Sequence, residues 1–135
     1  MEELKIMAKE ENLDIVLDAI KKHLDENDTP KSLAIPIMVA VEEIFVNIAH
    51  YAYGDKIGEA KVGMEVTPDP KKVVVVFRDK GTAYNPLAKE DPDLTLGAED
   101  RPIGGLGIYM TKELMDNMTY VYENDENVLT IEKAL

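Results

Sequence analysis

The chain has 135 residues, of which 45% are hydrophobic, so it can bury one core of ordinary size and we expect a single domain over residues 1–135. Its net charge of −12 disfavours nucleic acid or an anionic membrane as a partner, and the lack of cysteine excludes disulfides and thiolate metal sites. Because no basic start leads into an apolar stretch and no run of about 18 apolar residues occurs, we expect a cytoplasmic protein without a signal peptide or membrane span.

The first part of the chain is predicted to hold one short strand and two helices. Apolar and polar residues alternate over residues 4–8, as in an edge strand, although a tail would fit the same pattern. Apolar residues then recur every three or four positions over residues 12–24, which indicates an amphipathic helix. A second helix is expected to begin between Ser32 and Pro36 and to run to about Tyr53. It is apolar nearly all round, so it should be deeply buried.

The second part of the chain is predicted to be mostly strand. Alternation over residues 60–66 indicates a strand with one buried face, and the unbroken run Val73–Phe77 indicates a central strand covered on both faces. A helix is expected over about residues 106–115, followed by a hairpin of residues 118–122 and 128–132. These elements predict an α+β fold, a two-layer sandwich whose helices pack on one face of a mostly antiparallel mixed sheet.

Polar residues interrupt the buried helix at Glu43, Asn47 and His50, spaced four and three residues apart. This spacing places their side chains on one face of an α-helix. A carboxylate and an amide in an apolar setting cost several kcal/mol each, roughly, when they lack hydrogen-bond partners. Two interpretations remain open from spacing alone: the face reaches solvent, or it lines a pocket for a ligand.

Two glycine motifs follow. Asp79-Lys80-Gly81 comes directly after the valine-rich strand, where an acid beside a glycine leaves room for a planar ligand, although a turn explains it equally well. Gly104-Gly105-Leu106-Gly107 opens the last predicted helix, where backbone N–H groups can approach phosphates. An acidic protein that binds a polyanion needs local donors such as these backbone N–H groups. The alternative interpretation is that this glycine-rich segment is only a flexible connection.

In this order the three motifs resemble those of the histidine-kinase-like ATPase superfamily, which includes gyrase B subunits, sensor kinases and small anti-sigma kinases. Glu43–Asn47 is similar to its N box, Asp79–Pro86 to its first glycine box and Gly104–Ile108 to its second. The resemblance covers almost the whole chain. Because no helix with a phospho-acceptor histidine precedes the N box, it favours the anti-sigma-factor serine/threonine kinase branch.

The resemblance implies ATP and Mg²⁺ as cofactors and a role for each matched residue. Asp79 would accept a hydrogen bond from the adenine amino group, and Gly81 would leave room for the ring. Asn47 would coordinate Mg²⁺ beside the phosphates. Glu43 would act as general base toward a serine hydroxyl or water. The residues expected at the phosphates are Arg101, Gly104, Gly105, Leu106 and Gly107.

The chain departs from the family pattern at two places. Ala83 stands where the first glycine box commonly has a second glycine, which would change the shape of the pocket wall. Glu126-Asn127 replaces a Gly-Thr pair that often precedes the last family strand, which leaves a secondary contact to the base unassigned.

The function implied is that of a kinase that phosphorylates a serine on an anti-anti-sigma antagonist protein and otherwise sequesters a sigma factor. One alternative is a nucleotide-binding module without turnover, whose choice of partner follows its ATP or ADP state; Glu43 favours the kinase. Another is a subunit of a larger signalling assembly. The resemblance also implies a homodimer through the N-terminal strand region, with Leu4, Ile6 and Ala8 as candidate interface residues.

Overall fold

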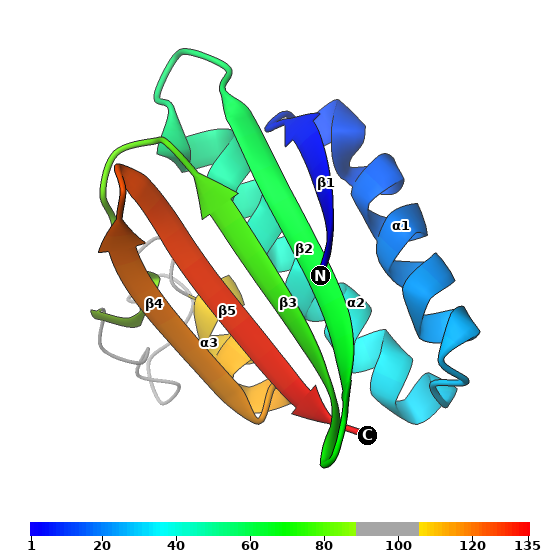
Figure 1. Ribbon diagram of the computed structural model, residues 1–135. Coiled ribbons are helices and arrows are strands. Elements are labelled where there is room, and N and C mark those ends of the chain that lie inside the picture. Colours follow the sequence, from blue (N-terminus) through cyan, green and yellow to red (C-terminus); the bar gives the residue numbers. More distant parts are fainter. Residues whose placement is uncertain (89–105) are drawn as a thin grey trace, which may run out of the picture.

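The computed structural model describes residues 1–88 and 106–135, and its centre is a five-stranded sheet (Figure 1). The strands are β1 (Glu2–Met7), β2 (Glu59–Pro68), β3 (Lys71–Asp79), β4 (Asn117–Glu123) and β5 (Glu126–Ala134). Their order in the sheet is β1-β2-β3-β5-β4, so the last strand of the chain lies between the third and the fourth. All pairings in this sheet are antiparallel, in line with the mostly antiparallel sheet expected from the sequence.

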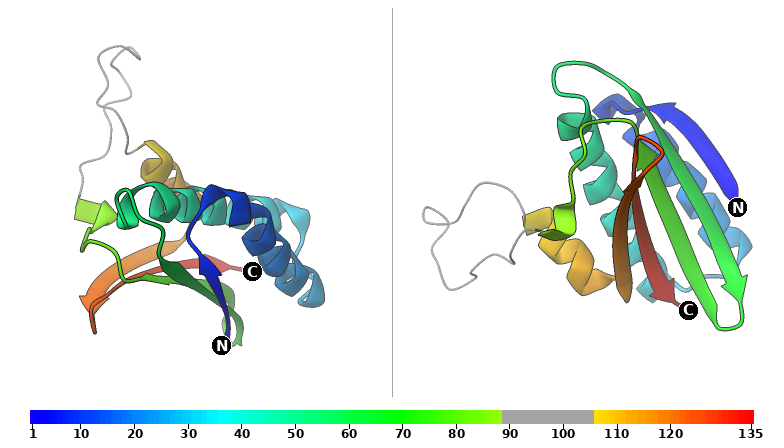
Figure 2. Two further views of the ribbon diagram at one scale, coloured as in Figure 1. Left: turned by 90° about the horizontal axis from the view of Figure 1, so that it is seen from above. Right: turned by 60° about the vertical axis from the view of Figure 1, so that its left-hand side comes forward.

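In the described residues the helices cover one face of the sheet (Figure 2). They are α1 (Leu13–Glu26), α2 (Lys31–Asn47) with a π-helical turn η2 (Ile48–Ala52), and α3 (Leu106–Leu114), with short 3-10 turns η1 (Glu10–Asn12) and η3 (Pro86–Ala88). α2 contacts both other helices and lies between them, with α1 toward β1 and α3 toward β4 and β5 (Figure 1). The predicted two-layer α+β sandwich, the layout called a Bergerat fold, is confirmed.

α2 is the central helix of the core. Among the described residues it is the one element that is long and apolar enough, with η2, to cross a membrane by length and composition. Its apolar residues are instead used inside the protein, because one face of the helix packs on the sheet. The buried residues of α2 are Ile37, Ala40, Val41, Ile44 and Phe45.

The ends of α2 differ slightly from the sequence-based prediction. The helix begins at Lys31, directly after Pro30, so Pro36 lies inside it and not at its start. A proline there removes one backbone N–H donor but leaves the rest of the helix intact. At the other end the helical backbone continues through the π-helical turn to Ala52, close to the expected end at Tyr53.

The interpretation of residues 4–8 as an edge strand, and not as a tail, is confirmed. β1 pairs along its length with β2, and the Ala8 N–H donates a hydrogen bond to the Gly58 carbonyl at 2.7 Å. Ala8 is buried in the core, and Leu4 and Ile6 pack against it. These three side chains, which we expected at a dimer interface, therefore contribute to the core of their own chain.

The valine-rich strand β3 lies at the centre of the sheet, but helices cover only one of its faces. Val73, Val75 and Phe77 point toward the helices and are almost fully buried. Val74 on the other face is also buried, since Glu65 and Glu132 flank it in register, whereas Val76 is partly exposed. The prediction that both faces are covered is therefore wrong for Val76.

The β4–β5 hairpin is longer and its turn tighter than the sequence indicated. The strands extend to Glu123 and Glu126, which pair with each other. The turn consists of Asn124 and Asp125, both with positive φ, at 53° and 61°. Two such residues suit the right-handed twist of a two-residue hairpin, and asparagine and aspartate tolerate this conformation better than most residues.

Candidate functional site

Asp79 is a buried carboxylate at the end of β3. Its exposed fraction is only 6%, although the residue is charged in water at neutral pH. Its Oδ1 accepts hydrogen bonds from the Gly81 N–H and from Asn127 Nδ2, each at 2.9 Å. No other described residue donates to Asp79, so Oδ2 is open to a donor from a ligand.

The electrostatic setting of Asp79 is a balance of opposing effects. Burial raises its pKa, because removal from water disfavours the charged form. The hydrogen bonds from Asn127 and Gly81 act in the opposite direction, while the nearby charge of Glu126 raises the pKa further. Oδ2 has no donor among the described residues and is not enclosed away from the surface, which is more typical of a binding site than of a structural contact.

Asn127 on β5 holds the segment that follows Asp79. Its Nδ2 also donates to the Thr82 carbonyl at 3.0 Å and lies 3.5 Å from the Gly81 carbonyl. Its Oδ1 accepts from the Tyr84 N–H at 3.1 Å and from the Tyr120 hydroxyl at 2.5 Å. Asn127 therefore connects β3, β4 and the loop at residues 81–84.

Gly81 packs directly on the end of the helix that carries the polar stripe. A Cβ built on Gly81 would lie 2.2 Å from the Ala52 carbonyl oxygen, and the Thr82 N–H donates to that same oxygen at 2.8 Å. Glycine is required here because backbone approaches backbone. The contact fixes the first glycine box beside the C-terminal end of η2.

Tyr53 provides a second connection to this loop. Its hydroxyl donates to the Glu59 carbonyl at 2.6 Å and accepts from the Lys80 N–H at 2.8 Å. Burial raises the pKa of Tyr53 more than the hydrogen bond from Lys80 lowers it. The ring lies against Gly58, where a Cβ would be 2.2 Å from the ring carbon that bears the hydroxyl.

Glu43 lies at the other end of the site, between α2 and α3. A Cβ built on Gly107 would lie 2.2 Å from Oε2 of Glu43, so the carboxylate occupies the space beside this glycine. The Thr111 hydroxyl donates to the Gly107 carbonyl at 2.9 Å, one turn further along α3. The structure thus brings the N box and the start of the last helix together, as the resemblance requires.

Glu43 and Asn47 are half-buried, one helical turn apart, and neither side chain hydrogen-bonds to any described residue. Side-chain oxygens without hydrogen-bond partners are suitable ligands for Mg²⁺. This ion usually takes few ligands from the protein, and waters or phosphate oxygens fill its other coordination positions. No cluster of three acidic or histidine ligands occurs in residues 1–88 and 106–135. The residues present therefore fit a magnesium ion held mainly by a phosphate ligand, to which Asn47 would contribute its side-chain oxygen.

The two ends of the site lie along one helix. Gly107 lies against Glu43 and Gly81 against Ala52, which follows nine positions later in the sequence. Nine positions of an α-helix span about 13.5 Å along the axis, and the π-helical turn in this stretch makes the separation somewhat smaller. The arrangement suits an elongated ligand with a flat group at Asp79 and an anionic group near Gly107.

His50 does not belong to this polar face, and the prediction that it shares the face of Glu43 and Asn47 is wrong. Its Nε2 lies 3.2 Å from Oε2 of Glu10, on the side of α1, whereas Glu43 lies on the side of α3. The reason is the π-helical turn η2, in which each turn contains more residues and the side-chain directions shift relative to an α-helix.

Several residues expected at the phosphates lie outside the described residues, namely Arg101, Gly104 and Gly105. Leu106 begins α3, as predicted, and Gly107 is its second residue. The sequence did not assign a role to Tyr53 or Asn127. Asn127 had one signal, its place where the family commonly has threonine, but its partners are mostly backbone groups that sequence patterns do not show.

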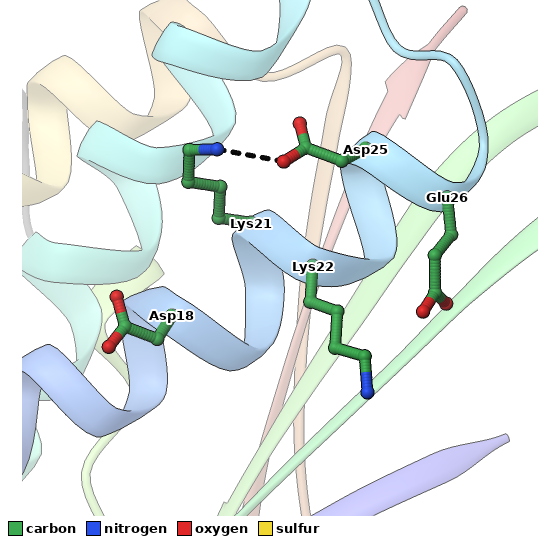
Figure 3. A pocket seen from close by; sticks show the side chains of 5 residues that line it. All are labelled: Asp18, Lys21, Lys22, Asp25 and Glu26. Carbon is green, nitrogen blue, oxygen red and sulfur yellow. Dashed lines mark hydrogen bonds and ion pairs between the residues drawn. The ribbon is translucent and has the colours of Figure 1, made fainter.

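A hollow beside α1 is unrelated to this site (Figure 3). All the side chains that line it come from α1, and Lys21 and Asp25 point toward each other to form an ion pair at 2.7 Å. Both side chains are more than 60% exposed, so the pair contributes little to stability. The lining residues are Asp18, Lys21, Lys22, Asp25 and Glu26.

Comparison with known proteins finds distant relatives among serine-protein kinases. The serine-protein kinase RsbW of Bacillus cereus strain AH187 is 26% identical over 129 residues, which cover 94% of this chain and 81% of that protein. The proteins of the same name from Bacillus cereus strain Q1 and Bacillus mycoides strain KBAB4 are each 28% identical, over 93 and 95 residues. Those two alignments cover 67% of this chain and 58% of each relative.

A family model described as the histidine kinase-like ATPase domain matches residues 6–133. This range includes β2, β3 and β4 in full, the end of β1 and nearly all of β5, and it contains all three motifs. The chain belongs to the histidine kinase-like ATPase domain family, and it is a distant homologue of the RsbW serine kinases.

Proposed function

We propose that this protein is a cytoplasmic serine/threonine protein kinase that binds ATP with Mg²⁺ and acts as an anti-sigma regulatory factor. The observation that carries the proposal is the pair of close contacts along one helix, Glu43 with Gly107 and Ala52 with Gly81. They support a single site in which Glu43 would be the general base, the start of α3 would bind phosphates and Asp79 would recognise adenine. The relatives named serine-protein kinase support the same activity.

At the base end, Asp79 would recognise adenine. Its Oδ2 has no donor among the described residues and can accept from an exocyclic amino group. Gly81 lies so close to the backbone of Ala52 that no side chain fits there, so the loop that donates to Oδ1 is held against η2. Asp79 is thus fixed by its own loop before the nucleotide arrives.

At the phosphate end, Asn47 would hold Mg²⁺ and the start of α3 would bind phosphate oxygens through backbone N–H groups. The magnesium ion would supply charge neutralisation on the phosphates. Leu106 and Gly107, the first two residues of α3, are the described members of this group, and Arg101, Gly104 and Gly105 complete it in the proposal. Because the net charge of the chain is −12, the phosphates need a bound cation and local hydrogen-bond donors to offset repulsion.

Glu43 would act as the general base. Its carboxylate would take the proton of a serine hydroxyl while the hydroxyl oxygen bonds to the γ-phosphorus and the bond to the bridging oxygen of ADP breaks. The products are phosphoserine and ADP. No described residue hydrogen-bonds to Glu43, so both carboxylate oxygens remain available as proton acceptors.

The proposed protein substrate is an anti-anti-sigma antagonist, and the second partner is a sigma factor that the protein sequesters. We propose a homodimer as the working form. Since Leu4, Ile6 and Ala8 pack on their own core, a dimer through this region would use the backbone edge of β1 and its outward side chains.

The test combines binding with turnover. Thermal unfolding of wild type with Mg²⁺ and ATP, ADP or GTP should give an adenine-specific rise in midpoint, corresponding to about 2.7 kcal/mol at 100 times the dissociation constant. Glu43→Gln should keep this rise but lower the formation of ADP from ATP about a hundredfold. Glu42→Gln, an exposed neighbour on the same helix, is the matched control and should leave both unchanged.

The outcomes separate the two candidate activities. If Glu43→Gln binds ATP and forms ADP at the wild-type rate, the kinase role of Glu43 is excluded and a nucleotide-binding module remains. If no nucleotide raises the midpoint of the wild type, the proposed site is not a nucleotide site.

A further inference from the structure

Asn127 holds a position in the site that the family resemblance leaves without a role. It lies directly opposite Asp79 in the register of β3 and β5, and its exposed fraction is 7%. Each side of its amide has hydrogen-bond partners in the described residues. A buried amide with this many partners has a single orientation that satisfies them all.

Two backbone groups determine that orientation, because one can only donate and the other can only accept a hydrogen bond. The Tyr84 N–H can only donate, so it requires the amide oxygen, and the Thr82 carbonyl can only accept, so it requires the amide nitrogen. The Asn127 nitrogen must therefore face Asp79. A flip of the amide would place its oxygen against two acceptors and its nitrogen against a donor.

This fixed amide determines what Asp79 can offer. Because Asn127 Nδ2 and the Gly81 N–H both donate to Oδ1, that oxygen can only accept. A proton on Asp79 would therefore reside on Oδ2, and would turn the open oxygen from an acceptor into a donor. The two states of Oδ2 select different ligands: an acceptor pairs with an amino group, and a donor pairs with a carbonyl.

We propose that Asn127 is the positioning residue that sets base selectivity, because its amide N–H holds Asp79 in the form whose Oδ2 accepts a hydrogen bond. The inference rests on the proposed nucleotide site and extends it. A purine with an amino group at position 6 is then preferred over one with a carbonyl there. Asn127 acts on the ligand through Asp79.

The neighbouring groups show why a donor is needed. Burial and the charge of Glu126 both favour a protonated Asp79, and they oppose the acceptor state. Among residues 1–88 and 106–135, the other titratable side chains that interact with Asp79 are Tyr53 and Tyr120, and neither is a cation. Asn127 and the Gly81 N–H are thus the groups that stabilise the carboxylate.

The experiment compares ATP with inosine triphosphate, which carries a carbonyl in place of the amino group, by equilibrium dissociation constants with Mg²⁺. Wild type should bind ATP more tightly. In Asn127→Leu, which keeps the shape but loses the donor, the ratio of the two constants should fall about tenfold, as expected for one hydrogen bond to a charged group.

Tyr120→Phe is the matched control. It removes one of the two hydrogen bonds that Asn127 Oδ1 accepts but leaves the donor to Asp79, so it should lower stability and keep the wild-type ratio. If the leucine variant does not fold, Asn127→Thr and Asn127→Val serve as an isosteric pair, and only the threonine can donate across the strand pair. The threonine variant should keep more of the preference for ATP.

A readout without nucleotide accompanies the binding data. The pKa of the Asp79 carboxyl group, followed by NMR, should rise in Asn127→Leu and not in Tyr120→Phe. If the leucine variant keeps the wild-type ratio and the wild-type pKa, the role of Asn127 is refuted while ATP binding stands. If wild type binds neither nucleotide, the proposed function fails, and the selectivity assigned to Asn127 fails with it.

Discussion

The carboxylate of Glu43 occupies the space that a side chain on Gly107 would need. A Cβ on Gly107 would lie 2.2 Å from Oε2 and 3.1 Å from Cδ of Glu43. Both atoms belong to the far end of a flexible side chain, which can move away without disturbing the backbone. The contact therefore controls the position of the proposed base more than it controls the stability of the fold.

Gly107→Ala is expected to change the free energy of unfolding by no more than about 1 kcal/mol, since alanine also favours the helix. ADP formation should fall about tenfold or more, because the displaced carboxylate no longer lies where the attacking hydroxyl binds. The double variant Glu43→Gln/Gly107→Ala should be no slower than Glu43→Gln alone. Additive losses would show that Gly107 acts independently of Glu43.

Gly81→Ala is expected to behave differently, because its neighbour is backbone. The new Cβ would lie 2.2 Å from the oxygen and 2.6 Å from the carbonyl carbon of Ala52. Relief requires movement of η2 or of the loop, so the free energy of unfolding in urea should fall by about 1–3 kcal/mol or more. Gly54→Ala, where no atom lies within 4 Å but φ is +62°, should cost only about 1–2 kcal/mol.

Asp79→Asn is expected to raise stability at pH 7 while it abolishes the ATP-specific rise in midpoint. Burial raises the pKa of Asp79, so the folded state binds this proton more tightly than the unfolded state. Relative to the variant, the wild type should lose unfolding free energy as pH rises from the ordinary value of 3.8 through the raised folded pKa. Above that pKa the difference should stay constant.

Unfolding midpoints of both proteins across this pH range check the prediction. Asp55→Asn, at an exposed position, is the control and should stay within about 0.5 kcal/mol of wild type. A variant at position 79 that is less stable than wild type at neutral pH would show that the hydrogen bonds to Oδ1 outweigh the cost of burial.

Asp125→Gly is expected to stabilise the β4–β5 hairpin. Asn124 and Asp125 both have positive φ, and an Asn-Gly pair suits this turn better than Asn-Asp. The unfolding free energy should rise by about 0.5 kcal/mol, and Asp125→Ala should lower it by about 1 kcal/mol. Calorimetry of both variants tests this prediction. If the two variants unfold at the same midpoint temperature, the turn conformation adds no strain.

The fold was largely predictable because its elements carry strong local patterns. The amphipathic period of α1 and the alternation in β2 reflect burial by a single neighbouring layer, and the unbroken valines of β3 reflect its central place in the sheet. Element ends were less predictable: the tight turn at Asn124 and Asp125 depends on strand pairing, which extends β4 and β5 beyond their apolar residues. Likewise the π-helical turn that redirects His50 has no period of its own in the sequence.

The site was predictable where a motif supplies both partners. Asp79 and Gly81 are two positions apart in the chain, and their hydrogen bond follows from the turn. Tyr53 and Asn127 were missed because they bind backbone groups far away in the sequence, the Lys80 N–H and the Thr82 carbonyl. Only the strand order brings these groups together.

The placement of β5 between β3 and β4 also has a consequence for the time course of folding. The partner of Asp79 lies 48 positions later in the chain, on the last strand. During synthesis from the N-terminus, a growing chain can form the β2–β3 hairpin early but has no Asn127 to anchor the loop at residues 81–84. Competence to bind the base would then arise only near the end of synthesis, so a chain cut short before β5 could not compete with the finished protein for its ligand.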